Sequence, residues 1–92
     1  MQDVNILLVE DNEGDIILTT EAFRDMELVN NVSVVRDGEE ALRFLRKQDE
    51  YMNAPTPQLI LMDINLPGID GKQLLGIIKK EEKLAELPVV ML

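Results

Sequence analysis

The fold of this chain is decided by residues 59–71, which read LILMDINLPGIDG. Four apolar residues lead directly into the carboxylate of Asp63, and a turn containing proline and glycine follows. A similar apolar run at residues 6–9 leads into the acidic pair Glu10 and Asp11. In an open parallel sheet, ligands bind outside the carboxyl ends of the strands. The two runs therefore predict neighbouring strands that end in a small acidic metal site.

Short apolar runs alternate along the chain with segments of helical period, which is typical of βα units around a parallel sheet. We expect four strands, at residues 4–9, 32–35, 59–62 and 89–92. Their almost continuous apolar character indicates burial on both faces, so helices must cover both sides of the sheet. The prediction is one α/β domain over residues 1–92, with a doubly wound parallel sheet of strand order 2-1-3-4.

Each expected helix begins at a side chain that can accept hydrogen bonds from the first helical turn. The candidate caps are Asn12, the pair Asp37 and Glu40 with capping-box spacing, and the capping-box pair Asp70 and Gln73. The faces expected against the sheet carry Ile16, Thr20 and Phe23 in the first helix, Ala41, Leu42 and Leu45 in the second, and Leu74, Leu75, Ile77 and Ile78 in the third. The first helix should reach about residue 25, and the third should end before Pro88.

The composition is strongly acidic, with 18 acidic residues, 9 basic residues and a net charge of −9. With one tyrosine, two phenylalanines and no tryptophan, the chain has no stacking platform and no basic groove, so we expect no direct nucleic-acid binding. The acidity would repel anionic substrates unless a cation screened it, which favours a divalent metal. Cysteine is absent, which excludes disulfides and thiol chemistry. No signal or membrane-spanning segment is visible, so we expect a cytoplasmic protein without membrane contact.

The expected convergence of Glu10, Asp11 and Asp63 carries the chemistry. Adjacent carboxylates repel one another, and a hard cation such as Mg²⁺ relieves the repulsion while keeping several waters. Asp11 and Asp63 are the expected direct ligands. If a phosphoryl oxygen replaces one metal-bound water, Asp63 can attack the phosphorus as a carboxylate nucleophile in an in-line transfer. The product would be an aspartyl phosphate.

These residues resemble the receiver domains of two-component response regulators. The match covers residues 4–92 and includes Glu10 and Asp11 after the first strand, Asp63 after the third, and the loop and cap residues Pro67, Gly68, Asp70 and Gly71. The resemblance implies a flavodoxin-like receiver fold. It also implies that the protein is not a classical enzyme. It implies that Asp63 is the phosphoacceptor and catalytic residue of a phosphorelay, and that it receives its phosphoryl group from a phosphohistidine of a sensor histidine kinase. It also implies that Glu10 and Asp11 assist Mg²⁺ binding and that Asn65 supplies a backbone carbonyl to the metal.

The runs at residues 9–12 and 36–38, with the proline-containing lead into the third strand, most resemble single-domain regulators paired with bacterial phytochrome-type kinases. Receiver domains continue after the fourth strand with a hydroxyl residue, a helix, a fifth strand ending in lysine, and a final helix. We therefore expect a receiver domain that is incomplete at its C-terminus, without the fifth strand and the last two helices. We also expect residues 1–92 to self-associate through the open edge of the fourth strand.

Simpler structural interpretations stay open for several of these residues. Taken alone, the pair Glu10 and Asp11 suits a helix cap as well as a metal site. The dipeptides at 67–68 and 70–71, taken singly, suit turn and cap chemistry. Two other functions are a receiver-like interaction module that is never phosphorylated and a Mg²⁺-dependent enzyme of the phosphatase or strand-cleavage type. Substitution of Asp63 separates the module from the receiver, because it abolishes signalling only in the receiver.

Overall fold

A four-stranded parallel sheet forms the centre of the molecule in the computed structural model, which describes residues 4–26 and 31–92. The strand order is β2-β1-β3-β4, as the sequence predicts. The strands are β1 (Asn5–Val9), β2 (Asn31–Val35), β3 (Leu59–Met62) and β4 (Val89–Met91). The helices are α1 (Glu13–Arg24), α2 (Gly38–Arg46), the short 3-10 helix η1 (Asp49–Tyr51) and α3 (Gly71–Lys80).

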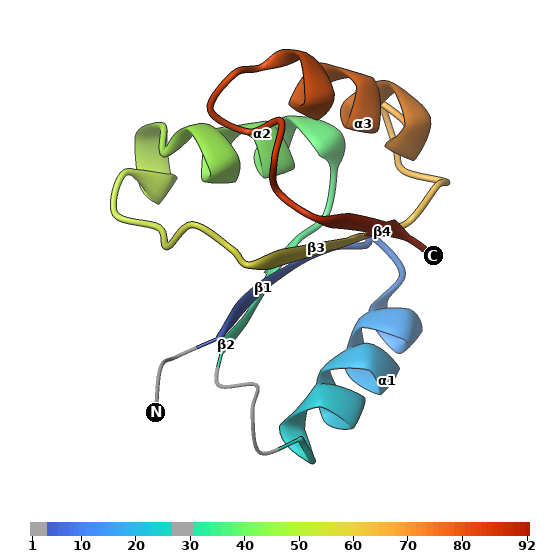
Figure 1. The fold of residues 1–92 in the computed structure, drawn as a ribbon. Helices are drawn as coiled ribbons and strands as arrows, with labels where there is room; N and C mark the ends of the chain where they lie inside the picture. Colours follow the sequence, from blue (N-terminus) through green and yellow to red (C-terminus); the bar gives the residue numbers. More distant parts are fainter. Residues whose placement is uncertain (1–3, 27–30) are drawn as a thin grey trace.

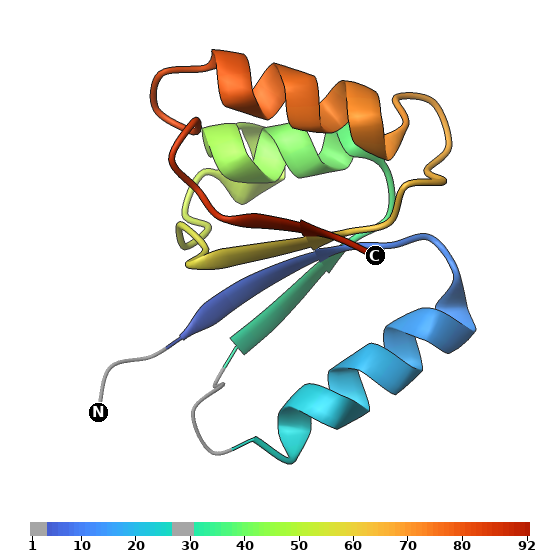
Figure 2. The same cartoon turned by 45° about the vertical axis from the view of Figure 1, so that its right-hand side comes forward.

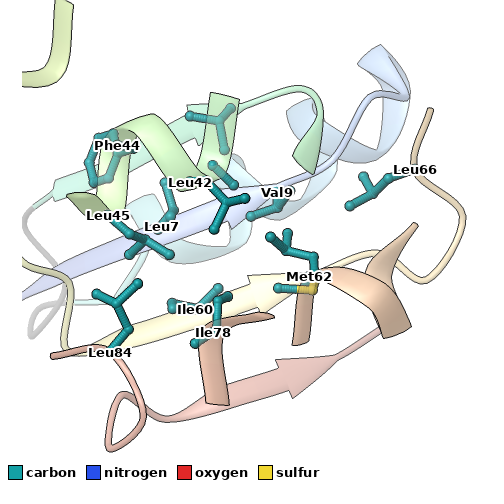
Figure 3. Close-up of a cluster of buried hydrophobic side chains, with 13 residues drawn as sticks. Leu7, Val9, Leu42, Phe44, Leu45, Ile60, Met62, Leu66, Ile78 and Leu84 are labelled. Carbon is teal, nitrogen blue, oxygen red and sulfur yellow. The ribbon is translucent and has the colours of Figure 1, made fainter. Parts of the chain in front are cut away.

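Helices cover both faces of the sheet, which confirms the doubly wound α/β fold. Helix α1 lies on one face, and α2 and α3 lie side by side on the other (Figures 1 and 2). The alternation of side chains along β1 divides the core: Leu7 and Val9 pack beneath α2 and α3, while Ile6 and Leu8 pack against α1. Figure 3 shows the larger of the two clusters, which fills the space between the sheet and α2 and α3. The continuous apolar runs are therefore explained by two separate buried layers.

The residues of the predicted helix faces are buried to different degrees. Ala41, Leu42 and Leu45 of α2 are buried, and so is Phe44, which the sequence pattern did not single out. In α3, Leu74 and Ile78 are buried, but Leu75 and Ile77 are only partly buried. A helix of 3.6 residues per turn cannot turn four positions within five residues fully toward one surface. No helix in the two described ranges is long and apolar enough to cross a membrane.

Two of the predicted caps form as expected. Asn12 accepts a hydrogen bond from the Asp15 backbone N–H at 2.9 Å, which starts α1. Asp70 and Gln73 form the reciprocal capping box: Asp70 accepts from the Gln73 N–H at 2.8 Å, and Gln73 accepts from the Asp70 N–H at 3.1 Å. This box begins α3 directly after the loop that follows β3.

The capping box expected at the start of α2 forms only in part. The Asp37 side chain accepts from the Glu40 N–H at 2.7 Å, but the Glu40 carboxylate does not return to Asp37. It accepts instead from the Arg36 N–H at 2.8 Å and from the Tyr51 hydroxyl at 2.5 Å. Glu40 therefore links the residue before α2 to η1. The capping-box pattern covers only residues 37–40, so it could not predict the contact with Tyr51.

Candidate functional site

Three carboxylates meet at the carboxyl edge of the sheet. The register pairs Val9 of β1 with Met62 of β3, so the next residues, Glu10 and Asp63, leave the sheet side by side. The Asp63 backbone N–H donates to the Val9 carbonyl at 3.0 Å, which extends the hydrogen-bond ladder to Asp63. One carboxylate oxygen from each of Glu10, Asp11 and Asp63 lies within 4.8 Å of the other two.

The carboxylates differ in their exposure to solvent. Glu10 is 5% exposed, Asp63 is half-buried and Asp11 is exposed. Burial raises the pKa of the Glu10 carboxyl, and the nearby carboxylates of Asp63 and Asp15 raise it further. A hydrogen bond from the Asn12 backbone N–H to Glu10 Oε1, at 3.1 Å, opposes part of that shift. The cluster is therefore electrostatically strained when its members are ionised together.

The donor set fits a hard divalent cation. All three side chains offer oxygen, the ligand atom that Mg²⁺ prefers, and two of them are open enough to leave positions for water. In the part of the chain that the structure describes, no lysine or arginine forms an ion pair with these carboxylates. A bound cation would supply the missing positive charge.

The loop after β3 holds Asp63 in place. The Asn65 backbone N–H lies 3.3 Å from Asp63 Oδ1, and the Gly71 N–H donates to the Ile64 carbonyl at 2.9 Å. Leu66 is buried and anchors the loop in the core, as Figure 3 shows. The role of the Asn65 carbonyl as a metal ligand stays a prediction.

Gly71 is more than part of a cap. A Cβ atom at this position would lie 2.4 Å from the Asp63 carbonyl oxygen and 2.8 Å from the Ile64 Cα. It would also meet the Met91 Cε at 2.9 Å. The absence of a side chain therefore lets the start of α3 approach the backbone of Asp63 itself.

The other loop residues shape the chain and do not join the carboxylates. Gly68 has a φ of 72°, in the left-handed region that favours glycine, and Pro67 precedes it in the turn. These two residues line a separate hollow with Asp37 and Glu39. Asp70 caps α3 through its own carboxylate.

Sequence reasoning missed the contact made by Gly38. A Cβ atom there would lie 2.9 Å from the Ile69 carbonyl oxygen and 3.0 Å from the Ile69 Cβ, so the start of α2 presses on the loop after β3. The only local signal was the glycine itself, which fits a cap motif equally well. A second missed contact is the ion pair of Arg36 and Glu13 at 2.7 Å, which joins the residue after β2 to the first residue of α1.

Residues 6–92 match the family model of the response regulator receiver domain. The chain belongs to this family. Response regulator Rcp1 of Synechocystis sp. is 44% identical over 87 residues, which cover 95% of this chain and 59% of Rcp1. The probable methanogenesis regulatory protein FilR2 of Methanothrix harundinacea is 39% identical, over 95% of this chain and 56% of its own length. This receiver chain thus spans about three fifths of the length of these relatives.

Solved structures of phytochrome response regulators share the fold. The phosphorylated cyanobacterial phytochrome response regulator RcpA is 46% identical with a TM-score of 0.93, over 98% of this chain and 64% of RcpA. The bacteriophytochrome response regulator AtBRR is 42% identical with a TM-score of 0.90, over 99% of this chain and 66% of AtBRR. The Mn²⁺-bound form of Rcp1 is 42% identical with a TM-score of 0.91, over 96% of this chain and 63% of Rcp1. These similarities confirm the predicted resemblance to the regulators of phytochrome-type kinases.

Proposed function

We propose that this receiver domain is a phosphoacceptor in a two-component phosphorelay and that Asp63 takes a phosphoryl group from a phosphohistidine of a phytochrome-type sensor kinase. The observation that carries the proposal is the cluster of Glu10, Asp11 and Asp63, whose oxygen atoms lie within 4.8 Å of one another at the carboxyl edge of the sheet. The similarity to the phosphorylated regulator RcpA supports it.

The metal part of the proposal assigns Asp11 and Asp63 as direct ligands and the Asn65 carbonyl as a third. Glu10 is the most buried of the three carboxylates, and its hydrogen bond from the Asn12 N–H fixes it beside the other two. The similarity to a regulator solved with Mn²⁺ supports a divalent ion here. When bound, Mg²⁺ would neutralise the carboxylates and the charge of the phosphoryl oxygens.

The transfer itself needs only one nucleophile from this chain. A carboxylate oxygen of Asp63 attacks the phosphorus, a P–O bond forms as the P–N bond to histidine breaks, and the imidazole leaves with the electron pair. The backbone of Asp63 is held by the Val9 carbonyl, and the N–H of Asn65 orients the carboxylate. Fixed positioning of the nucleophile is the main contribution that a protein makes in this chemistry.

The acceptor is tested by phosphorylation with acetyl phosphate or a phytochrome-type kinase, followed by Phos-tag electrophoresis. We expect Mg²⁺-dependent labelling of the wild type and none of Asp63→Asn. Asp25→Asn is the matched control, because Asp25 is an exposed carboxylate at the other end of α1. Undiminished labelling of Asp63→Asn would show that another residue is the acceptor.

The metal site is tested separately by titrating Mg²⁺ and following backbone amides by NMR. We expect the largest shifts at residues 10–12 and 63–65, and we expect Asp11→Asn to weaken them. Uniform small shifts over the whole chain would refute this site. A phosphorylation-independent interaction module would bind its partner equally well with Asp63→Asn, so kinase or partner binding by that variant distinguishes the two functions.

A further inference from the structure

A cavity of about 390 Å³ lies at the end of the sheet opposite Asp63. Its walls come from three segments: the end of α2, the connection from α2 to β3 at Thr56, and the connection from α3 to β4. Leu45 and Leu84 line it and are buried in the core. Figure 3 shows these two leucines at the end of the cluster away from Leu66, which belongs to the loop between Asp63 and α3. The cavity is therefore separate from the carboxylate site.

Side-chain contacts hold the walls of this cavity together. Arg46 of α2 forms an ion pair with Glu81, which joins the helix to the α3–β4 connection. The Lys79 ammonium donates to the Ala85 carbonyl at 3.0 Å and to the Leu87 carbonyl at 2.9 Å, which braces the same connection from α3. The walls of the cavity are thus connected to one another by an ion pair and hydrogen bonds.

The rim is cationic although the molecule is acidic. Arg46, Lys47 and Lys83 line the cavity, which is three of the nine basic residues in a chain of net charge −9. Among the described residues of the lining, Glu81 is the only acidic one, and it forms an ion pair with Arg46. Neither Lys47 nor Lys83 has an ion pair with any residue that the structure describes. Two lysines of the lining therefore carry a charge that no described carboxylate pairs with.

Basic side chains commonly lie near helix C-termini because they complement the terminal carbonyls. At the end of α2 the carbonyls of Arg43 and Phe44 already accept from the backbone N–H of Lys47, which adopts a left-handed conformation. The Lys47 side chain is not needed for that purpose, and Lys83 lies outside any helix. Helix capping therefore does not account for these two charges.

We propose that this cavity binds a small organic anion with an apolar body and a single carboxylate or phosphate head. Its volume lies near the lower end of the range of small-molecule sites, about 300–1,000 Å³. Leu45 and Leu84 would receive the apolar body, and Lys47 and Lys83 the anionic head. No step of this proposal uses Asp63, so it stands or falls independently of the phosphoacceptor function.

The test is an NMR titration of the chain with octanoate, octyl phosphate and the neutral analogue octanamide. We expect saturable shifts at residues 45–47, 56 and 81–84 with both anions, and much weaker binding of octanamide. Whichever anion binds more tightly identifies the preferred head group. The absence of saturable shifts at millimolar anion would overturn the proposal, and so would equal binding of octanamide.

Charge variants then locate the binding site. The double variant Lys47→Gln with Lys83→Gln should weaken octanoate binding about fivefold, because each exposed charge contributes modestly. Arg24→Gln with Lys72→Gln is the matched control, since it removes the same net charge from exposed residues that do not line the cavity. All four positions are exposed, so both variants should keep a folded amide spectrum. Equal weakening by the control pair would show a general charge effect and would refute the site.

Discussion

Replacement of Gly71 by alanine is the sharpest test of how the carboxylate site at Asp63 is built. The added methyl group would lie 2.4 Å from the Asp63 carbonyl oxygen, which is about 1 Å closer than an ordinary contact. The backbone there cannot yield easily, because the Asp63 N–H is bonded to Val9 and the Ile64 carbonyl to the Gly71 N–H. Overpacking of this kind costs about 1–3 kcal/mol.

Alanine also has a favourable effect that must be subtracted. Replacing glycine by alanine in a helix raises the free energy of unfolding by about 0.5–1 kcal/mol, largely because it lowers the conformational entropy of the unfolded chain. We therefore expect Gly71→Ala to lower the free energy of unfolding by up to about 2.5 kcal/mol. We also expect weaker Mg²⁺ binding, because the methyl group displaces the backbone that carries the Asp63 carboxylate.

The matched control lies in the same helix. Gly76 is exposed, and a Cβ atom there would have no neighbour within 4 Å, so Gly76→Ala should gain about 0.5–1 kcal/mol. Urea unfolding followed by circular dichroism gives both stabilities, and the NMR titration gives both Mg²⁺ affinities. If Gly71→Ala were as stable as Gly76→Ala and bound Mg²⁺ normally, the argument from close approach would be wrong.

Three further predictions concern other parts of the chain. Burial and Asp63 hold the pKa of Glu10 in the folded state above its ordinary value of 4.5. Because the folded state then holds the proton more tightly than the unfolded state, the free energy of unfolding without metal should fall as the pH rises from 4.5 through the raised pKa. Glu10→Gln should lack this fall, gain stability at neutral pH without metal, and bind Mg²⁺ more weakly. Tyr51→Phe should lower the free energy of unfolding by about 1 kcal/mol, because it removes the hydrogen bond that the tyrosine hydroxyl donates to Glu40. The pKa of Tyr51 is about 12, so this loss of stability should stay constant near neutral pH. A polypeptide of residues 1–92 should self-associate, because Val90 on β4 is 46% exposed and the strand pairs only with β3 among the described residues.

Each of these has a decisive measurement. Urea unfolding at a series of pH values, with and without Mg²⁺, tests Glu10→Gln, and an unchanged pH profile would contradict the raised pKa. Thermal or urea unfolding of Tyr51→Phe tests the hydrogen bond, with no loss of stability as the contrary result. Sedimentation equilibrium at low micromolar concentration tests association, and a stable monomer would refute it.

The strand pattern and the acidic cluster were predictable because they depend on short stretches of chain. A buried parallel strand needs an apolar run, and a run such as 59–62 is visible without any knowledge of its neighbours. Once the strand order was inferred, Glu10 and Asp63 had to meet, because parallel strands end at the same edge. The caps at Asn12 and Asp70 are equally local, since each side chain bonds a backbone three residues away.

Other features depend on segments that are far apart in the sequence. Glu40 leaves its expected capping box because Tyr51 reaches it, and Gly71 is required by the carbonyl of Asp63. The partial burial of Leu75 likewise depends on how α3 sits on the sheet. Local patterns in the chain are enough to define which elements form and which carboxylates meet. How closely these elements approach depends on tertiary packing, because steric contact and burial are properties of the packed chain and not of any local pattern.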